Sequence, residues 1–158
     1  MTTARELKEG DPAPRIELPD ESGALFRLSD LKGKNVILYF YPKADTPGCT
    51  KESCAFRDDS KKIGRKNTVI VGVSPDKSAA QLKFKEKFDL PFTLLADTEH
   101  AAALAYGVWK EKSMYGRKYM GIERTTFLIG ADGKIRKIFP KVKVAGHAAE
   151  VLAALDSI

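Results

Sequence analysis

Four apolar runs with almost no polar interruption mark the chain as a protein with buried strands. They span residues 35–41, 68–74, 92–96 and 125–130, and the first is rich in β-branched and aromatic side chains. Segments of mixed apolar and charged character lie between or after them and predict helices, the second of which would have Ser78 as its N-cap. The expected helices cover residues 50–65, 78–88, 101–106 and 148–155.

Turn signals divide the rest of the chain into hairpins. Residues 15–18 and 25–28 alternate like short strands around a Pro-Asp-Glu-Ser-Gly turn, and an Asp-Gly pair separates 125–130 from 135–139. We find no internal repeat and no low-complexity linker. The pattern therefore predicts one domain over residues 1–158, an α/β fold with a mixed central β-sheet flanked by helices and an N-terminal β-hairpin.

Composition narrows the class of protein without naming a function. The 27 basic and 21 acidic residues give a net charge of +6, but the two signs are interspersed, so we expect mixed charged faces and no nucleic-acid partner. No apolar stretch approaches the ~20 residues of a spanning helix, and the N-terminus has no apolar signal core. We therefore expect a cytoplasmic protein with no membrane partner.

The chain has two cysteines, Cys49 and Cys54, and the first lies where a buried strand gives way to a predicted helix. An ordinary thiol has a pKa of about 8.5, and helix amides together with the helix dipole favour its anion. The Thr46 hydroxyl lies three residues earlier, Pro42 and Pro47 shape the loop, and an arginine from another strand could supply positive charge. This pattern indicates redox chemistry, because a second thiol can condense with an oxidised first one.

The spacing of the two cysteines carries a structural consequence. Five residues along an ideal helix leave the Cα atoms roughly 8.6 Å apart, whereas a disulfide needs about 4.4–6.8 Å. If both cysteines are helical when reduced, the helix must unwind before they can join.

Other interpretations of these residues remain open at this point. Cys49 could be a buried, inert side chain, as unpaired cysteines often are, and Cys54 could be an ordinary packed helix residue. There is no Cys-x-x-Cys pair, which disfavours a disulfide exchanger of that type. The two histidines, His100 and His147, are interpreted as surface residues at helix starts, which leaves a zinc site or a Cys-His hydrolase poorly supported. We find no phosphate loop and no dinucleotide fingerprint, and expect neither cofactor nor metal.

The cysteine loop resembles the active-site motif of the peroxiredoxins. Pro42-x-x-x-Thr46-x-x-Cys49 matches the family pattern, and the longer string Phe40-Tyr-Pro-Lys-Ala-Asp-Thr-Pro-Gly-Cys-Thr-Lys-Glu-Ser-Cys-Ala-Phe-Arg-Asp is similar to the bacterioferritin-comigratory (Q-type) subfamily. The likeness extends along nearly the whole chain, through Gly10-Asp-Pro-Ala-Pro, Tyr106-Gly-Val-Trp-Lys-Glu-Lys, Tyr115-Gly-Arg-Lys-Tyr-Met-Gly and Arg124-Thr-Thr-Phe-Leu-Ile.

The resemblance implies a thioredoxin-like fold and the reduction of hydrogen peroxide and organic hydroperoxides. Cys49 would be the peroxidatic thiolate that becomes a sulfenic acid, and Cys54 the resolving thiol of an intramolecular disulfide. Thr46 and Arg124 match the family's peroxide-positioning residues and Pro42 its shielding proline. Glu52 falls where the family often has an acid near the site. Thioredoxin or a glutaredoxin would then regenerate the thiols.

One position departs from the family pattern, and two alternative functions are also consistent with the sequence. Ala44 stands where many relatives have an acidic residue, a change expected to tune the loop. The alternatives are a protein thiol–disulfide oxidoreductase and a peroxide-responsive redox sensor. We expect a monomer, because a resolving cysteine within the chain removes the chemical need for a partner subunit.

Overall fold

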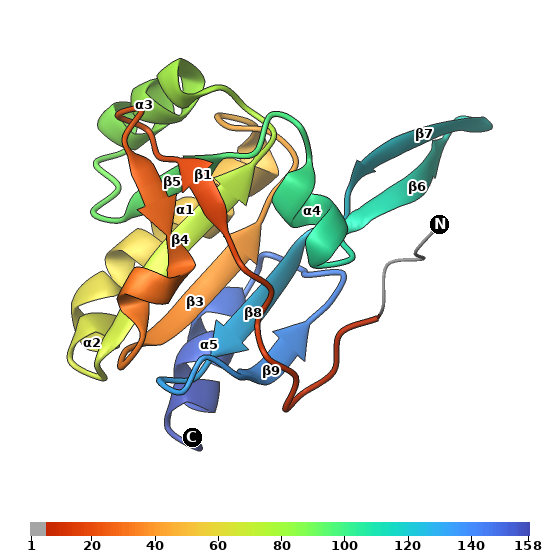
Figure 1. Ribbon diagram of the computed structural model, residues 1–158. Coiled ribbons are helices and arrows are strands. Elements are labelled where there is room, and N and C mark those ends of the chain that lie inside the picture. The colour runs from red at the N-terminus through yellow and green to blue at the C-terminus, as the bar shows by residue number, and fades with distance from the viewer. Residues whose placement is uncertain (1–5) are drawn as a thin grey trace.

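The computed structural model describes residues 6–158 and is built around a five-stranded sheet (Figure 1). Its order is β5 (Thr93–Ala96), β4 (Thr68–Ser74), β3 (Asn35–Phe40), β8 (Thr125–Ile129) and β9 (Ile135–Phe139). The first three strands are parallel, and β8 and β9 run antiparallel to their neighbours. The mixed sheet predicted from the sequence is confirmed.

Two apolar layers sandwich this sheet because side chains alternate along its central strand. Ile37 and Tyr39 join the layer that packs with α1 (Pro47–Asp58), α2 (Ser60–Gly64), α3 (Ser78–Lys87) and α5 (His147–Leu155). Leu38 and Phe40 face the opposite layer, which includes α4 (Ala101–Ala105) and residues of the N-terminal hairpin. That hairpin, β1 (Glu17–Pro19) with β2 (Leu25–Arg27), leads into the short 3-10 helix η1 (Leu28–Leu31).

A second hairpin was not predicted from the sequence. Strands β6 (Trp109–Met114) and β7 (Arg117–Ile122) pair antiparallel and project from the body of the molecule (Figure 1). Most of their residues are exposed, so the apolar alternation that reveals a half-buried strand is missing.

Three local predictions were wrong. The helix expected over 50–65 begins earlier, with Pro47 in its first turn, and is broken at Asp59 into α1 and α2. Ser78 does not cap α3, because the N-cap position falls on Lys77. His147 does begin a helix, but it is buried rather than on the surface.

The burial of His147 fixes α5 against the sheet. Its Nε2 atom lies 2.7 Å from Oγ1 of Thr126 and its Nδ1 atom 2.8 Å from Oε1 of Glu150, and its ring packs edge-on against Phe56 and Phe139. Burial lowers the pKa of His147. A neutral imidazole therefore joins β8, α1 and α5 in one packed unit.

Candidate active site

The candidate site lies at the edge where the parallel strands end and β8 begins. Phe40, the last residue of β3, pairs with Thr125, the first of β8, and with Val73 near the end of β4. This register brings the loop after β3 beside Arg124, although 75 residues separate Arg124 from Cys49 in sequence. The carboxyl ends of strands are where open α/β sheets place their sites.

The loop from β3 to α1 is anchored by Asp76. The amide of Ala44 donates to Oδ2 of Asp76 at 2.7 Å, and the Ser74 hydroxyl donates to the same oxygen at 2.6 Å. Next to Ala44, Asp45 adopts a left-handed conformation with φ of 60°. The carboxylate of Asp76 thus holds the middle of a loop whose backbone turns sharply.

Gln81 ties the start of the same loop to two neighbouring strands. The buried Tyr41 hydroxyl donates to Oε1 of Gln81 at 2.6 Å. The Gln81 amide in turn donates to the Ser74 hydroxyl and to the carbonyl of Leu95. Because each of these buried polar groups has a partner, the network fixes the loop without leaving an unsatisfied donor.

Cys49 lies in the first turn of α1 and is almost fully buried, with 1% of its surface exposed. Thr46 is the N-cap residue, but its hydroxyl donates to the carbonyl of Lys43 at 2.8 Å and does not cap the helix through its side chain. The hydroxyl oxygen therefore has lone pairs free to accept a hydrogen bond from another group. Pro42, half-buried, forms the bend directly after Tyr41.

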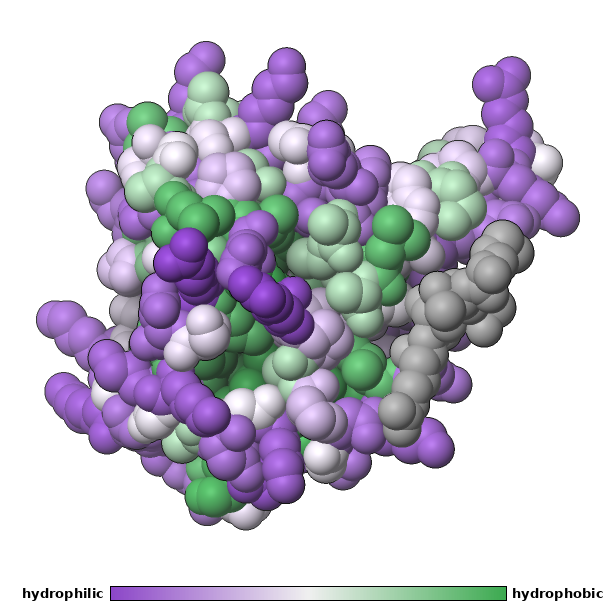
Figure 2. Space-filling view, viewed as in Figure 1, coloured by the Kyte–Doolittle hydropathy of each residue, from purple (hydrophilic) through white to green (hydrophobic). Residues whose placement is uncertain are grey.

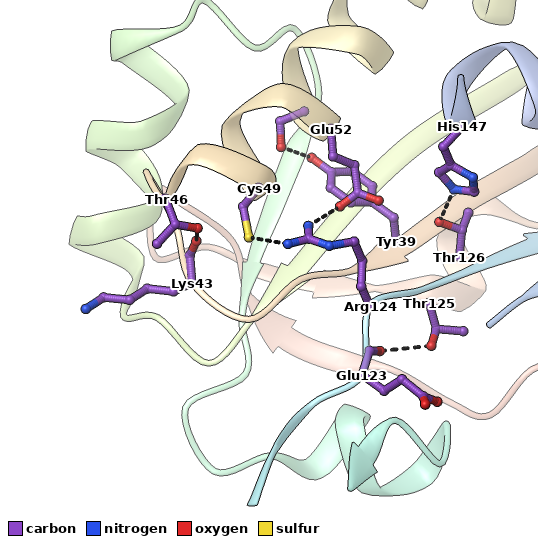
Figure 3. A network of polar contacts seen from close by, with 11 residues as sticks. Tyr39, Lys43, Thr46, Cys49, Glu52, Glu123, Arg124, Thr125, Thr126 and His147 are labelled. Carbon is purple, nitrogen blue, oxygen red and sulfur yellow. Dashed lines mark hydrogen bonds and ion pairs between the residues drawn. The ribbon is translucent and has the colours of Figure 1, made fainter. Parts of the chain in front are cut away.

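One guanidinium group joins the cysteine to an acid on the same helix. Figure 3 shows the Arg124 side chain between Cys49 and Glu52, with Nη2 donating to Sγ at 3.2 Å and Nη1 donating to Oε1 at 2.8 Å. Arg124 is only 18% exposed. Burial acts to lower its pKa, but the charges of Glu52 and Cys49 outweigh burial and the pKa is raised. Arg124 therefore stays charged beside the sulfur.

Glu52 is the buried end of this pair. Burial raises the pKa of its carboxyl to about 7, although the charge and hydrogen bond of Arg124 lower it. Its second oxygen, Oε2, is buried and finds no hydrogen-bond partner among residues 6–158. Glu52 thus orients Arg124 from one oxygen while its other oxygen remains unsatisfied.

Gly48 leaves the space through which Arg124 reaches the sulfur. A Cβ atom at Gly48 would lie 3.2 Å from Nη2 of Arg124, closer than a comfortable contact. The glycine in Pro-Gly-Cys is therefore required by the approach of a side chain and not by a left-handed backbone.

Cys54 lies five residues, about 1.4 turns, after Cys49 on α1. Both thiols are free, and Cys54 is partly exposed whereas Cys49 is buried. The structure thus has both cysteines in one continuous helix, the arrangement in which they cannot join without local unwinding.

The predicted site residues fall into three groups. Cys49, Arg124 and Glu52 are in direct contact. Thr46 and Pro42 belong to the loop that leads into α1, and Cys54 lies farther along the helix. Sequence analysis missed Asp76, Gln81 and Gly48. The glycine directly before Cys49 was a visible signal in the sequence, because it leaves space beside the sulfur. Asp76 and Gln81 carry no such signal, because they act through contacts with residues that are distant in sequence. Within residues 6–158 no group of three acidic, histidine or cysteine side chains could hold a metal ion.

Comparison with known proteins places the chain in a family. The family model described as AhpC/TSA matches residues 9–138. The chain belongs to this peroxiredoxin family. It is 51% identical to a putative peroxiredoxin Bcp of Coxiella burnetii over 94% of this chain and 99% of the relative, and 52% identical to peroxiredoxin Bcp of Bacillus subtilis over 96% and 97%.

Solved peroxiredoxin structures share its fold. Peroxiredoxin Q of Xylella fastidiosa superposes with a TM-score of 0.91 at 34% identity, covering 97% of this chain and 98% of that one. Peroxiredoxin Q of Xanthomonas campestris gives 0.86 at 39% identity, with 90% of each chain covered. The expected thioredoxin-like peroxiredoxin fold is confirmed, and the chain is a thiol-dependent peroxidase with a peroxide substrate and a thiol reductant.

Proposed function

We propose that Cys49 is the peroxidatic residue of a peroxidase that reduces hydrogen peroxide and organic hydroperoxides. The observation that carries the proposal is the hydrogen bond from the buried Arg124 guanidinium to the Cys49 sulfur, at 3.2 Å. The guanidinium and the amino-terminal end of α1 both place positive charge beside the sulfur, where the nucleophilic form of a cysteine carries its negative charge. A buried sulfur with this partner is arranged for reaction, whereas an inert core cysteine needs no cation.

The first step forms one bond and breaks one. The Cys49 thiolate attacks the terminal oxygen of a hydroperoxide, so that an S–O bond forms as the O–O bond breaks and its electron pair leaves with the other peroxide oxygen, the one attached to R or, in hydrogen peroxide, to H. The sulfur is oxidised to sulfenic acid, and the alkoxide or hydroxide that departs takes up a proton to give an alcohol or water. Arg124 stabilises the negative charge as it moves from sulfur to the departing oxygen.

Thr46 and Pro42 shape the space in front of the sulfur. Because the Thr46 proton is donated to the Lys43 carbonyl, its oxygen is oriented to accept the hydroperoxide O–H. Pro42, half-buried in the bend after Tyr41, has no amide N–H to donate. Glu52 positions Arg124 and does not contact the substrate in this scheme.

The second step makes a disulfide within the chain. The Cys54 thiol attacks the Cys49 sulfenic sulfur, an S–S bond forms, and the oxygen leaves as water after taking up a proton. The residues between the two cysteines must then leave the helix. Unwinding them would break the contact of Glu52 with Arg124 and the 2.8 Å hydrogen bond between Ser53 and Tyr39. The loss of these contacts adds to the free-energy cost of reaching the oxidised form.

We also propose the reductant, the cellular location and the oligomeric state of the protein. We assign reduction of the disulfide to thioredoxin or a glutaredoxin, with no bound cofactor, in a cytoplasmic monomer formed by a single domain over residues 1–158. Both cysteines lie on one helix of the same chain, so the two-cysteine cycle needs no group from a second chain. In the described residues, no helix is long and apolar enough to cross a membrane.

Peroxide consumption by paired variants tests the assignment. Cys49→Ser should abolish peroxide reduction in a thioredoxin-coupled assay, whereas Cys54→Ser should still form a sulfenic acid, trapped by dimedone, but turn over poorly. Full activity of Cys49→Ser would overturn the assignment. Rapid exchange with protein disulfides but slow reaction with peroxide would favour the oxidoreductase alternative, and peroxide oxidation without turnover by any reductant would favour the sensor.

A further inference from the structure

The outer end of the β6–β7 hairpin gathers exposed apolar side chains. In the described residues eight large hydrophobic side chains are exposed, and four of them lie within seven residues here: Met114, Tyr115, Tyr119 and Met120. Figure 2 shows the hairpin standing out from the body, with paler surface between hydrophilic atoms. A cluster of this kind, so far from the core, needs an explanation outside the fold.

The same segment is basic. Residues 112–122 contain Lys112, Arg117 and Lys118 and no acidic residue. Among the described residues Arg117 has no ion-pair partner, and Lys118 has only Glu111, 3.7 Å away on the exposed face of the ribbon. We call Met114, Tyr115, Arg117, Lys118, Tyr119 and Met120 the hairpin tip. Its surface combines two cations with amphipathic and apolar side chains.

Tyr115 adds a conformational argument. It occupies the left-handed region, with φ of 52°, in the turn that also contains Gly116, and it is 98% exposed. A hairpin turn of this shape favours Asn, Asp or Gly at such a position. The chain thus has an aromatic side chain where the backbone disfavours one and where the fold does not bury it. Because the unfavourable backbone conformation of Tyr115 is not offset by packing within the fold, it points to a contact of this side chain outside the molecule.

The chemistry of the tip favours one kind of contact. Stable protein–protein interfaces need about 800 Å² of closely complementary surface on each partner, with charged residues depleted at their centre, whereas two cations lie among the six side chains of the tip. A bilayer needs no matching shape: basic side chains bind anionic headgroups, and tyrosine settles at the interface between headgroups and acyl chains.

We propose that the hairpin tip docks this protein on anionic lipid bilayers, with Arg117 and Lys118 at the headgroups and Tyr115 and Met114 in the interface. This proposal departs from the expectation of no membrane partner, which was drawn from the lack of a spanning segment. Docking at the surface needs no such segment. The hairpin runs directly into Glu123 and Arg124, so the docked face and the active site share one stretch of chain. The proposal does not rest on the proposed function, because binding is measured without turnover.

Vesicle sedimentation of the full-length reduced protein tests the proposal. The vesicles contain phosphatidylcholine alone, or phosphatidylcholine with roughly a third phosphatidylglycerol, at about 0.05 M and about 0.5 M salt. We expect binding only to the anionic vesicles and its loss at the higher salt concentration. Arg117→Gln with Lys118→Gln should lower the partition coefficient about 30-fold, since each basic residue near an anionic surface contributes about a factor of five. Tyr115→Asn, which suits the left-handed backbone, should lower binding without harming the fold.

A charge-matched control separates the tip from net charge. Lys61→Gln with Lys62→Gln removes the same charge from the exposed face of α2, and should leave binding within about twofold of the unsubstituted protein. All variants should react with hydrogen peroxide at the same rate as the unsubstituted protein. Equal losses for both double variants, or no binding to anionic vesicles at low salt, would overturn the proposal. So would a tip-dependent increase in mass with protein concentration, which would assign the surface to a second copy of the chain.

Discussion

Arg124 donates a hydrogen bond to the sulfur of Cys49, with Nη2 3.2 Å from Sγ, and the same guanidinium holds Glu52 through Nη1. A forked side chain is required for both contacts, because the two acceptors lie on successive turns of α1 and are met by two nitrogens at once.

Replacing Arg124 by lysine keeps the charge but removes the fork. We expect Arg124→Lys to lower the second-order rate constant with hydrogen peroxide by about 10²–10³-fold, the usual effect of losing a donor that stabilises developing charge. Stopped-flow tryptophan fluorescence or competition kinetics would measure this. Arg136→Lys, at an exposed pair with Asp132, is the matched control and should react at the normal rate. A normal rate for Arg124→Lys would show that charge alone is sufficient.

Gly48→Ala tests the approach of Arg124 to the sulfur. The added methyl group would lie 3.2 Å from Nη2, so the guanidinium must move by a few tenths of an ångström. We expect the peroxide rate constant to fall about tenfold, since small misplacements of a positioning group are costly. Gly64→Ala, where a Cβ atom would meet no atom of the described residues within 4 Å, should leave the rate unchanged. Equal rates for both variants would contradict the steric argument.

Asp76 is expected to act on the reaction through the loop that it anchors. Asp76→Ala removes the acceptor of the Ala44 amide and of the Ser74 hydroxyl, and should cost about 2 kcal/mol of stability together with a slower peroxide reaction. Asp76→Asn keeps an acceptor oxygen and should recover most of the rate. Glu17→Ala, at an exposed pair on β1, is the control for loss of a surface carboxylate. If Asp76→Ala lowers stability but not the rate, the anchor is structural only.

Glu52 makes stability depend on pH in a defined direction. Its pKa is about 7 in the folded protein, raised from an ordinary value of 4.5 chiefly by burial. Between pH 4.5 and pH 7 the Glu52 carboxyl is therefore protonated in the folded protein and ionised in the unfolded chain. The free energy of unfolding consequently falls as pH rises from about 4.5 to about 7. Glu52→Gln removes this contribution, so the unfolding free energy of the unsubstituted protein should fall relative to the variant across that window.

Urea titrations of both proteins at several pH values measure this difference. Because the variant retains His147, whose lowered pKa changes stability in the opposite sense below about 6.5, the comparison isolates Glu52. A difference between the two proteins that does not change with pH would contradict the assigned titration.

The predicted and the missed features have different physical origins. The strands of the sheet could be predicted because residues such as Ile37 and Leu38 are buried on both faces of the sheet and leave an unbroken apolar run. The β6–β7 hairpin could not, because its exposed strands, such as Arg117–Ile122, do not alternate apolar and polar residues. Cys49 was marked by its place between strand and helix. Arg124 followed only from the resemblance, since its contact with the sulfur depends on strand register.

The buried polar partners show the same limit. Nothing local in the sequence distinguishes Asp76 from other loop acids, or His147 from a surface histidine. Their roles arise from Ala44 and Thr126, which are distant in sequence and adjacent only in the fold.

The most direct test of the account is intact mass with free-thiol counting after one equivalent of hydrogen peroxide is added to the fully reduced protein. Conversion of the Cys49 thiolate to a disulfide with Cys54 should remove both thiols within the mixing time of the experiment and lower the mass of the monomer by about 2 Da. Survival of both thiols for minutes would contradict the central claim and return Cys49 to the role of a buried, unreactive side chain.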